Sequence, residues 1–125
     1  MDKKKILIIE DEASTQAILS SVLTEKGYEV QVADNGEDGL AAIRDWYPSL
    51  VVLDIILPKK NGFEVLEEIK KDEKIADTPV IILSNLSQPQ DVQRAIEYGV
   101  LVYLVKTEYG IEDIAKKIEN ALNFL

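Results

Sequence analysis

The chain contains five short apolar runs, and each is followed by a stretch in which apolar residues recur at helical spacing. The runs stand about 20 to 30 residues apart, which is the length of one strand followed by one helix. Strands and helices that alternate in this way predict a parallel sheet with helices on both faces. The five predicted strands are Ile6–Ile9, Tyr28–Ala33, Leu50–Leu53, Val80–Leu83 and Val100–Val105.

The polarity of the runs predicts their places in the sheet. Four runs are apolar on both faces, as expected of strands buried between two layers of helices. Tyr28–Ala33 instead alternates apolar and polar side chains, which is typical of an edge strand. Because an open sheet has two edges, Val100–Val105 is the candidate for the other one. In that position the final strand and its flanking helices would offer a docking face.

Helical periodicity predicts five helices, one after each strand. Gly27 and Gly99 mark the ends of the first and the fourth, and Pro48 ends the second. The predicted apolar faces are Ala17, Ile18, Val22 and Leu23; Leu40, Ile43 and Trp46 or Tyr47; Leu66 and Ile69; Val92, Ala95 and Ile96; and Ile111, Ile114, Ile118, Ala121 and Leu122.

Length and composition fit one globular domain over residues 1–125. With 46% hydrophobic and 30% charged residues, the chain falls outside the disordered and low-complexity classes. No apolar run approaches the roughly 20 residues of a membrane span, and the first run is too short for a signal peptide. We therefore expect a cytoplasmic protein without a membrane partner.

Charge and missing residue types narrow the chemistry. The net charge of −9 argues against direct nucleic-acid binding, because phosphate backbones require a basic surface. The chain has no Cys and no His, which excludes disulfides, thiolate nucleophiles, zinc–thiolate sites and His-based triads. Carboxylates, hydroxyls, lysines and backbone groups must carry any acid–base or metal chemistry.

Polar residues stand where four of the predicted strands end. The carboxyl ends of parallel strands share one edge of the sheet, so we expect these side chains to converge there. Two like charges 4 Å apart repel by about 4 kcal/mol at an effective dielectric of about 20, and a lysine and Mg²⁺ (or Mn²⁺ or Ca²⁺) would offset that cost. The residues are Glu10-Asp11-Glu12, Asp54, Ser84-Asn85 and Lys106-Thr107.

In this order the residues resemble the response-regulator receiver domain of two-component signalling, of the CheY-like kind. The resemblance covers essentially the whole chain. It implies a flavodoxin-like, doubly wound parallel sheet of five strands in the order 2-1-3-4-5 with five helices. The motifs that carry it are Ile8–Glu12, Val52–Pro58, Asn61-Gly62, Ser84, Tyr103 and Lys106.

The resemblance implies a phosphoacceptor and a metal site. Asp54 matches the aspartate that attacks a phosphoryl group held on a histidine of a sensor histidine kinase or a histidine phosphotransfer protein. Asp11 and Asp54 match direct Mg²⁺ ligands, Glu10 a ligand through water, and Ile56 a residue whose backbone carbonyl coordinates the ion; Mn²⁺ is the expected substitute.

It also implies a switch. Lys106 matches the lysine that pairs with the phosphoryl oxygens, Ser84 the hydroxyl that moves to bind them, and Tyr103 the aromatic residue that follows this movement. Phosphorylation would then change the surface of the last two strands and their helices, where a downstream protein or a second copy of the chain docks. Such a domain acts only on itself and is no conventional enzyme.

Three departures from the family pattern carry expectations. Thr107 stands where a proline usually follows the lysine across a cis peptide bond, and such a bond before another residue costs about 2.5–4 kcal/mol. Either that bond is kept or the loop is rebuilt. Asn85 could crowd access to Asp54. Ile56 and Leu86 are apolar where polar residues often place a hydrolytic water, so we expect slow loss of the phosphoryl group.

Three other classes compete. A receiver-like interaction domain that works without phosphate would lack the acceptor, the acid pair or the lysine, and none is missing here. A phosphatase with an aspartate nucleophile typically has a second aspartate two residues later, where this chain has Ile56. A nucleotide- or flavin-binding domain lacks support because no glycine-rich loop follows Ile6–Ile9.

Overall fold

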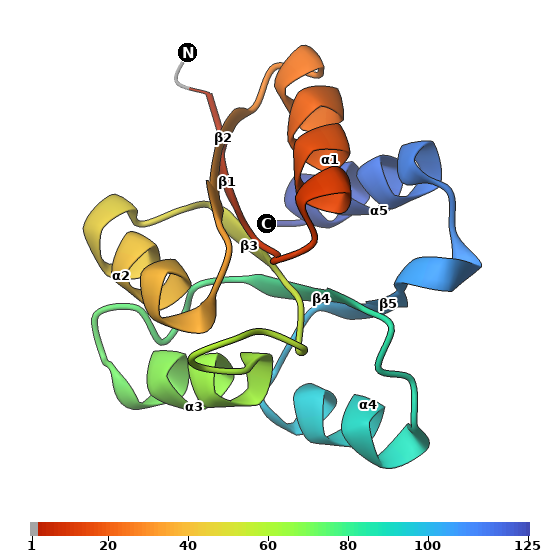
Figure 1. Cartoon of the computed structure of the whole chain (residues 1–125). Helices are drawn as coiled ribbons and strands as arrows, with labels where there is room; N and C mark the ends of the chain where they lie inside the picture. Colours follow the sequence, from red (N-terminus) through yellow and green to blue (C-terminus); the bar gives the residue numbers. More distant parts are fainter. Residues whose placement is uncertain (1–2) are drawn as a thin grey trace.

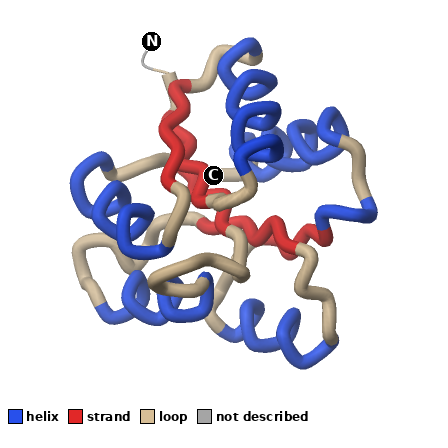
Figure 2. Tube along the Cα trace, viewed as in Figure 1, coloured by secondary structure: helices blue, strands red, loops and turns tan. Residues whose placement is uncertain are grey.

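The computed structural model describes residues 3–125, along which strands and helices alternate. The strands are β1 (Lys5–Ile9), β2 (Glu29–Ala33), β3 (Leu50–Leu53), β4 (Val80–Ser84) and β5 (Val102–Val105). The helices are α1 (Ala13–Glu25), α2 (Gly36–Trp46), α3 (Gly62–Lys71), α4 (Pro89–Glu97) and α5 (Ile111–Asn123), with a 3₁₀ turn, η1 (Lys106–Glu108), after β5. The strands form one parallel sheet in the predicted order, β2-β1-β3-β4-β5 (Figures 1 and 2).

Two hydrophobic cores lie on opposite faces of the sheet. Along β1, Ile6 and Ile8 join the core with α1 and α5, whereas Leu7 and Ile9 join the core with α2, α3 and α4. Figure 1 shows the same division of the helices. A strand covered on both sides needs apolar residues at every position. This requirement explains the unbroken apolar runs in β1, β3 and β4.

The edge strands lie where the sequence predicted them. β2 has β1 as its neighbour and leaves Glu29 and Gln31 exposed. β5 forms the opposite edge, and its first residue, Val102, is 37% exposed. The strand begins at Val102 rather than Val100. The residues just before it include Leu101, which is also exposed, so apolar side chains remain accessible at this edge.

Two helix faces differ from the prediction. On α1, Leu19 and Leu23 are fully buried, whereas Ile18 is 51% exposed. Residues four apart share a helix face, and α1 carries apolar side chains on two faces, so periodicity alone could not select the buried one. On α4, Ala95 is buried and Ile96 is exposed. None of the helices within residues 3–125 has the length and apolar character to cross a bilayer.

Candidate phosphoacceptor and metal site

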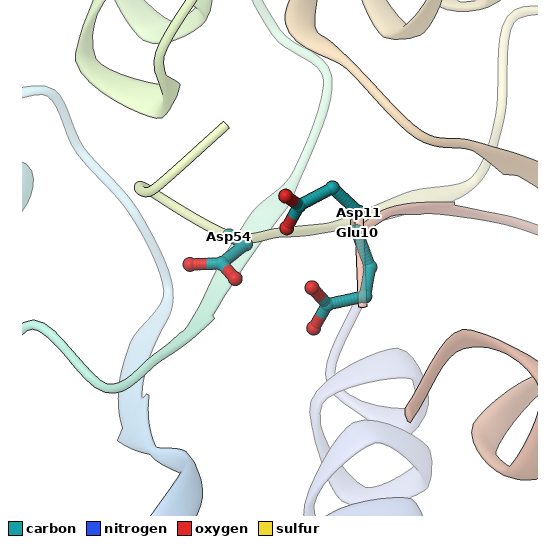
Figure 3. A group of neighbouring side chains, drawn as sticks. All are labelled: Glu10, Asp11 and Asp54. Carbon is teal, nitrogen blue, oxygen red and sulfur yellow. The ribbon is translucent and has the colours of Figure 1, made fainter. Parts of the chain in front are cut away.

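Three carboxylates meet at the carboxyl edge of the sheet (Figure 3). Asp54 follows β3, and Glu10 and Asp11 follow β1. Each offers an oxygen, and these oxygens all lie within 4.8 Å of one another. Glu10 and Asp54 are buried, whereas Asp11 is exposed. The cluster is therefore open to solvent on the side of Asp11.

Strand pairing sets the positions of the two buried carboxylates. Ile9 pairs with Leu53 in the parallel register of β1 and β3, so the residues that follow them come level. The backbone N–H of Asp54 donates to the Ile9 carbonyl at 3.0 Å, and that of Glu10 donates to the Ala33 carbonyl at 2.9 Å. The sheet hydrogen bonds thus continue one residue past β1 and β3, into the site itself.

Local hydrogen bonds orient Glu10. The Glu12 backbone N–H donates to Glu10 Oε2 at 3.1 Å, and Gln16 Nε2 donates to the Glu10 carbonyl at 2.9 Å. Burial raises the pKa of Glu10 above its ordinary value, and the hydrogen bond from Lys106 acts against that rise. Sequence reasoning did not single out Gln16. Its position one turn into α1 gives no signal that it reaches back to the backbone of Glu10.

Lys106 lies between the two buried carboxylates. Its Nζ is 2.8 Å from Asp54 Oδ2 and 2.5 Å from Glu10 Oε1, and its side chain is 13% exposed. Burial alone would lower the pKa of Lys106, but its hydrogen bonds to Asp54 and Glu10 outweigh burial and raise it. With all groups ionised, three carboxylates and one ammonium leave a net charge of −2. A divalent cation would balance this charge.

The loop after Lys106 is rebuilt. Residues 3–125 contain no cis peptide bond, so Lys106 and Thr107 are joined in trans, and the 3₁₀ turn η1 starts at Lys106 itself. Of the two outcomes expected from Thr107, the structure shows the second. Lys106 nevertheless reaches Asp54, so its placement does not depend on a proline at residue 107.

Ser84 and Tyr103 meet at the backbone of Leu86. Ser84 is fully buried at the end of β4, and its Oγ accepts a hydrogen bond from the Leu86 N–H at 3.3 Å. The Tyr103 hydroxyl donates to the Leu86 carbonyl. Burial, with smaller contributions from the charges of Asp91 and Asp54, raises the pKa of Tyr103 to about 12. The sequence could not reveal this link, because any residue at position 86 supplies the same backbone atoms.

Two further residues flank the carboxylates. The backbone N–H of Ile56 donates to Asp54 Oδ1 at 3.1 Å, while the Ile56 side chain is 56% exposed. Asn85 is exposed and lines, with Lys106 and Ile18, a groove of about 360 Å³ between α1 and the segment after β5. Asn85 therefore shares a groove with Lys106 of the site.

The structure is a doubly wound α/β fold with acidic residues and a lysine at the carboxyl edge of its sheet, the edge at which such folds bind their ligands. Within this class of fold the match is specific, since the family model of the response regulator receiver domain covers residues 6–119. The chain belongs to this family and is a signalling domain of two-component systems.

Known proteins agree with this assignment. The chain is 41% identical over 120 residues to the probable transcriptional regulator ycf27 of Pyropia yezoensis, covering 96% of this chain and 48% of that protein. It is 36% identical over 118 residues to the DNA-binding dual master transcriptional regulator RpaA of Synechocystis, covering 94% and 48%. A CheY-like receiver domain from Methanospirillum hungatei superposes with a TM-score of 0.88 at 27% identity, covering 98% and 95%.

The chain spans about half the length of these curated relatives. Both relatives are described as transcriptional regulators, and one as DNA-binding. The expectation that nucleic acid is no direct partner therefore has no support from the comparisons. The net charge on which it rested describes this chain alone.

Proposed function

We propose that the chain is a phosphorylation-gated switch in which Asp54 accepts a phosphoryl group from a histidine of a sensor kinase or a histidine phosphotransfer protein in the cytoplasm. One observation carries the proposal. The Asp54 carboxylate is buried at the sheet edge, with Lys106 Nζ at 2.8 Å and two more carboxylates within metal-ligating reach. A carboxylate in that setting has both its charge partner and a place for a cation.

The oxygen-only donor set fits Mg²⁺. Asp11 and Asp54 would bind the ion directly, Glu10 through water, and Ile56 through its backbone carbonyl, with Mn²⁺ as a substitute. The net charge of −2 and the spacing of the three carboxylates support the carboxylate part of this ligand set. When bound, the ion would neutralise charge on the phosphoryl oxygens.

The transfer needs little covalent help from the protein. An oxygen of Asp54 forms a bond to phosphorus as the bond between phosphorus and the donor nitrogen breaks, and its electron pair stays on that nitrogen. Positioning and charge neutralisation do most of the catalytic work in such reactions. The Ile56 N–H fixes one oxygen of Asp54, and Lys106 is placed to pair with the incoming phosphoryl oxygens.

Phosphorylation would reorganise the β4-α4-β5-α5 surface. A phosphoryl group carries a charge of about −1.5 to −2, and Ser84 would turn its hydroxyl toward it. Ser84 would then exchange its contact with the Leu86 N–H, and Tyr103, which holds the Leu86 carbonyl, would follow. The exposed Val102 lies on this surface, where a downstream protein or a second phosphorylated copy would dock. The chain would act only on itself, by accepting the group and later releasing it.

Intact mass after incubation with Mg²⁺ and acetyl phosphate tests the proposal. The expected result is one added phosphoryl group, absent with chelator and absent in Asp54→Ala, while the exposed control Asp45→Ala is labelled normally. If no adduct forms, the cognate histidine kinase is tried next, because Asn85 could exclude the small donor. Failure with the kinase as well would reject phosphorylation and favour an interaction domain that works without phosphate.

A further inference from the structure

The first turn of α2 packs closely against the loop between β3 and α3. A Cβ added at Gly36 would lie 2.0 Å from the Lys60 carbonyl oxygen and 2.7 Å from the Lys60 carbonyl carbon. The Gly36 N–H also donates to the Pro58 carbonyl at 3.4 Å. In Figure 1 this loop turns back toward α2 before α3 begins. Because the crowding atoms are backbone, a larger residue cannot be accommodated by a side-chain rotation.

Of the two segments in this contact, α2 is held more firmly than the loop. Asn35 is 3% exposed, and its Oδ1 accepts from the Asp38 N–H at 2.8 Å and so caps the helix. Leu40 and Ile43 hold α2 in the core at 2% and 0% exposure. The loop side is looser, since Lys59 is exposed and Lys60 is only partly buried. Any crowding at Gly36 should therefore displace the loop.

The same loop reaches the proposed phosphoacceptor. It starts at Asp54, and the Ile56 N–H binds Asp54 Oδ1. At its far end, Gly62 donates to the Ile55 carbonyl at 2.8 Å, and a Cβ at Gly62 would lie 2.6 Å from the Asp54 carbonyl oxygen. The loop is thus fixed at both ends by the site and by α3, and its middle rests on Gly36.

We propose that Gly36 is a positioning residue for the phosphoacceptor loop. By leaving room for residues 58–60, it lets the backbone of Ile56 sit beside Asp54, where its N–H holds the carboxylate and its carbonyl serves the cation. The inference rests on the proposed function and adds a residue that lies outside the acid cluster.

Gly36→Ala tests the inference, with Gly110→Ala as its matched control. Gly110 precedes α5 with φ −76°, and a Cβ there meets nothing within 4 Å. Calorimetric titration with MgCl₂ on the unphosphorylated proteins gives the dissociation constant, and urea unfolding in chelator gives the stability. Changes to residues that support metal ligands typically cost about 10- to 100-fold in metal affinity. We expect Mg²⁺ binding at least about tenfold weaker in Gly36→Ala and unchanged in Gly110→Ala.

Labelling by acetyl phosphate supplies the second readout. In Gly36→Ala the Mg²⁺ concentration that gives half the maximal rate should rise in step with the dissociation constant. Wild-type Mg²⁺ affinity in a folded Gly36→Ala protein overturns the inference. A Gly36→Ala chain that does not fold overturns it as well, because a residue that only positions one loop would not be needed for the folding of both cores. Absence of Mg²⁺ binding in the wild type would instead reject the proposed function.

Discussion

At the scale of single residues, repulsion within the acid cluster should be measurable as stability. Asp11 faces Glu10 and Asp54, and among residues 3–125 Lys106 is the only cationic side chain paired with those two carboxylates. Unit charges roughly 4 Å apart in a water-like dielectric repel by about 1 kcal/mol. Asp11→Asn should therefore raise the free energy of unfolding in chelator by about 1 kcal/mol.

Urea titrations at pH 7 measure this difference, with Asp45→Asn on the exposed side of α2 as the control. The control should stay within about 0.5 kcal/mol of the wild type. With saturating Mg²⁺ the advantage of Asp11→Asn should shrink or reverse, because the wild type gains from binding the ion. An Asp11→Asn protein less stable than the wild type in chelator would contradict the repulsion.

The raised pKa of Tyr103 predicts that the free energy of unfolding depends on pH in the alkaline range. Its pKa is raised from 10.0 to about 12, chiefly by burial. Between these values the folded chain keeps a proton that the unfolded chain has lost, so the stability that Tyr103 contributes is lost as the pH rises through this window. Urea midpoints of the wild type should fall relative to Tyr103→Phe between pH 10 and 12. A constant difference across this range would show that Tyr103 titrates normally.

The apolar side chains of Ile56 and Leu86 are the reason to expect slow loss of the phosphoryl group, and Ile56 offers the direct test. Its side chain is 56% exposed beside Asp54 and offers no polar atom to hold an attacking water. Wild-type phosphoprotein should release phosphate slowly without a phosphatase, and Ile56→Asn should speed release by about tenfold, within the range expected of an oriented reactant. A phosphate-release time course on purified phosphoprotein measures both rates. Rapid release by the wild type would contradict the predicted slow loss of the phosphoryl group.

The candidate site residues could be predicted from the sequence where their side chains form the contacts. Glu10, Asp54 and Lys106 stand at strand ends, and the structure brings them into contact. The contributions of Leu86 and Gly36 could not be predicted, because a backbone carbonyl and a missing Cβ act through tertiary approach, for which one sequence holds no pattern.

At the scale of elements, α1 offers a test of which face is buried. Leu19 is fully buried and Ile18 is 51% exposed. Leu19→Ala should cost about 2–5 kcal/mol because it opens a cavity in the core, whereas Ile18→Ser should change stability by no more than about 0.5 kcal/mol. Chemical denaturation of the two variants makes the comparison. Equal losses of stability in the two variants would indicate that Ile18 is buried, as the sequence predicted.

The sheet was more predictable than the helix faces for a physical reason. A strand between two helix layers requires apolar residues at every position, and an edge strand does not, so β1 and β2 differ plainly in sequence. A helix such as α1 can carry apolar residues on two sides. Which side is buried depends on the neighbours, here the core shared with α5.

At the scale of the whole molecule, the proposed cation should stabilise the fold by mass action. A ligand at about 100 times its dissociation constant adds about 2.7 kcal/mol to the free energy of unfolding when it binds only the folded state. Mg²⁺ should produce this gain in thermal or urea unfolding, and NaCl of equal ionic strength should not. Equal gains with both salts would indicate simple charge screening.

The partner of Asp54 arrives late in the chain. Lys106 lies 52 residues beyond Asp54 and belongs to the segment after β5, the last strand. During synthesis, therefore, a ribosome-bound chain that has emerged only as far as β4 holds the acidic residues without their lysine. On the proposed function, such a nascent chain would lack the charge partner that phosphoryl transfer to Asp54 needs, and only a chain translated past β5 would acquire it.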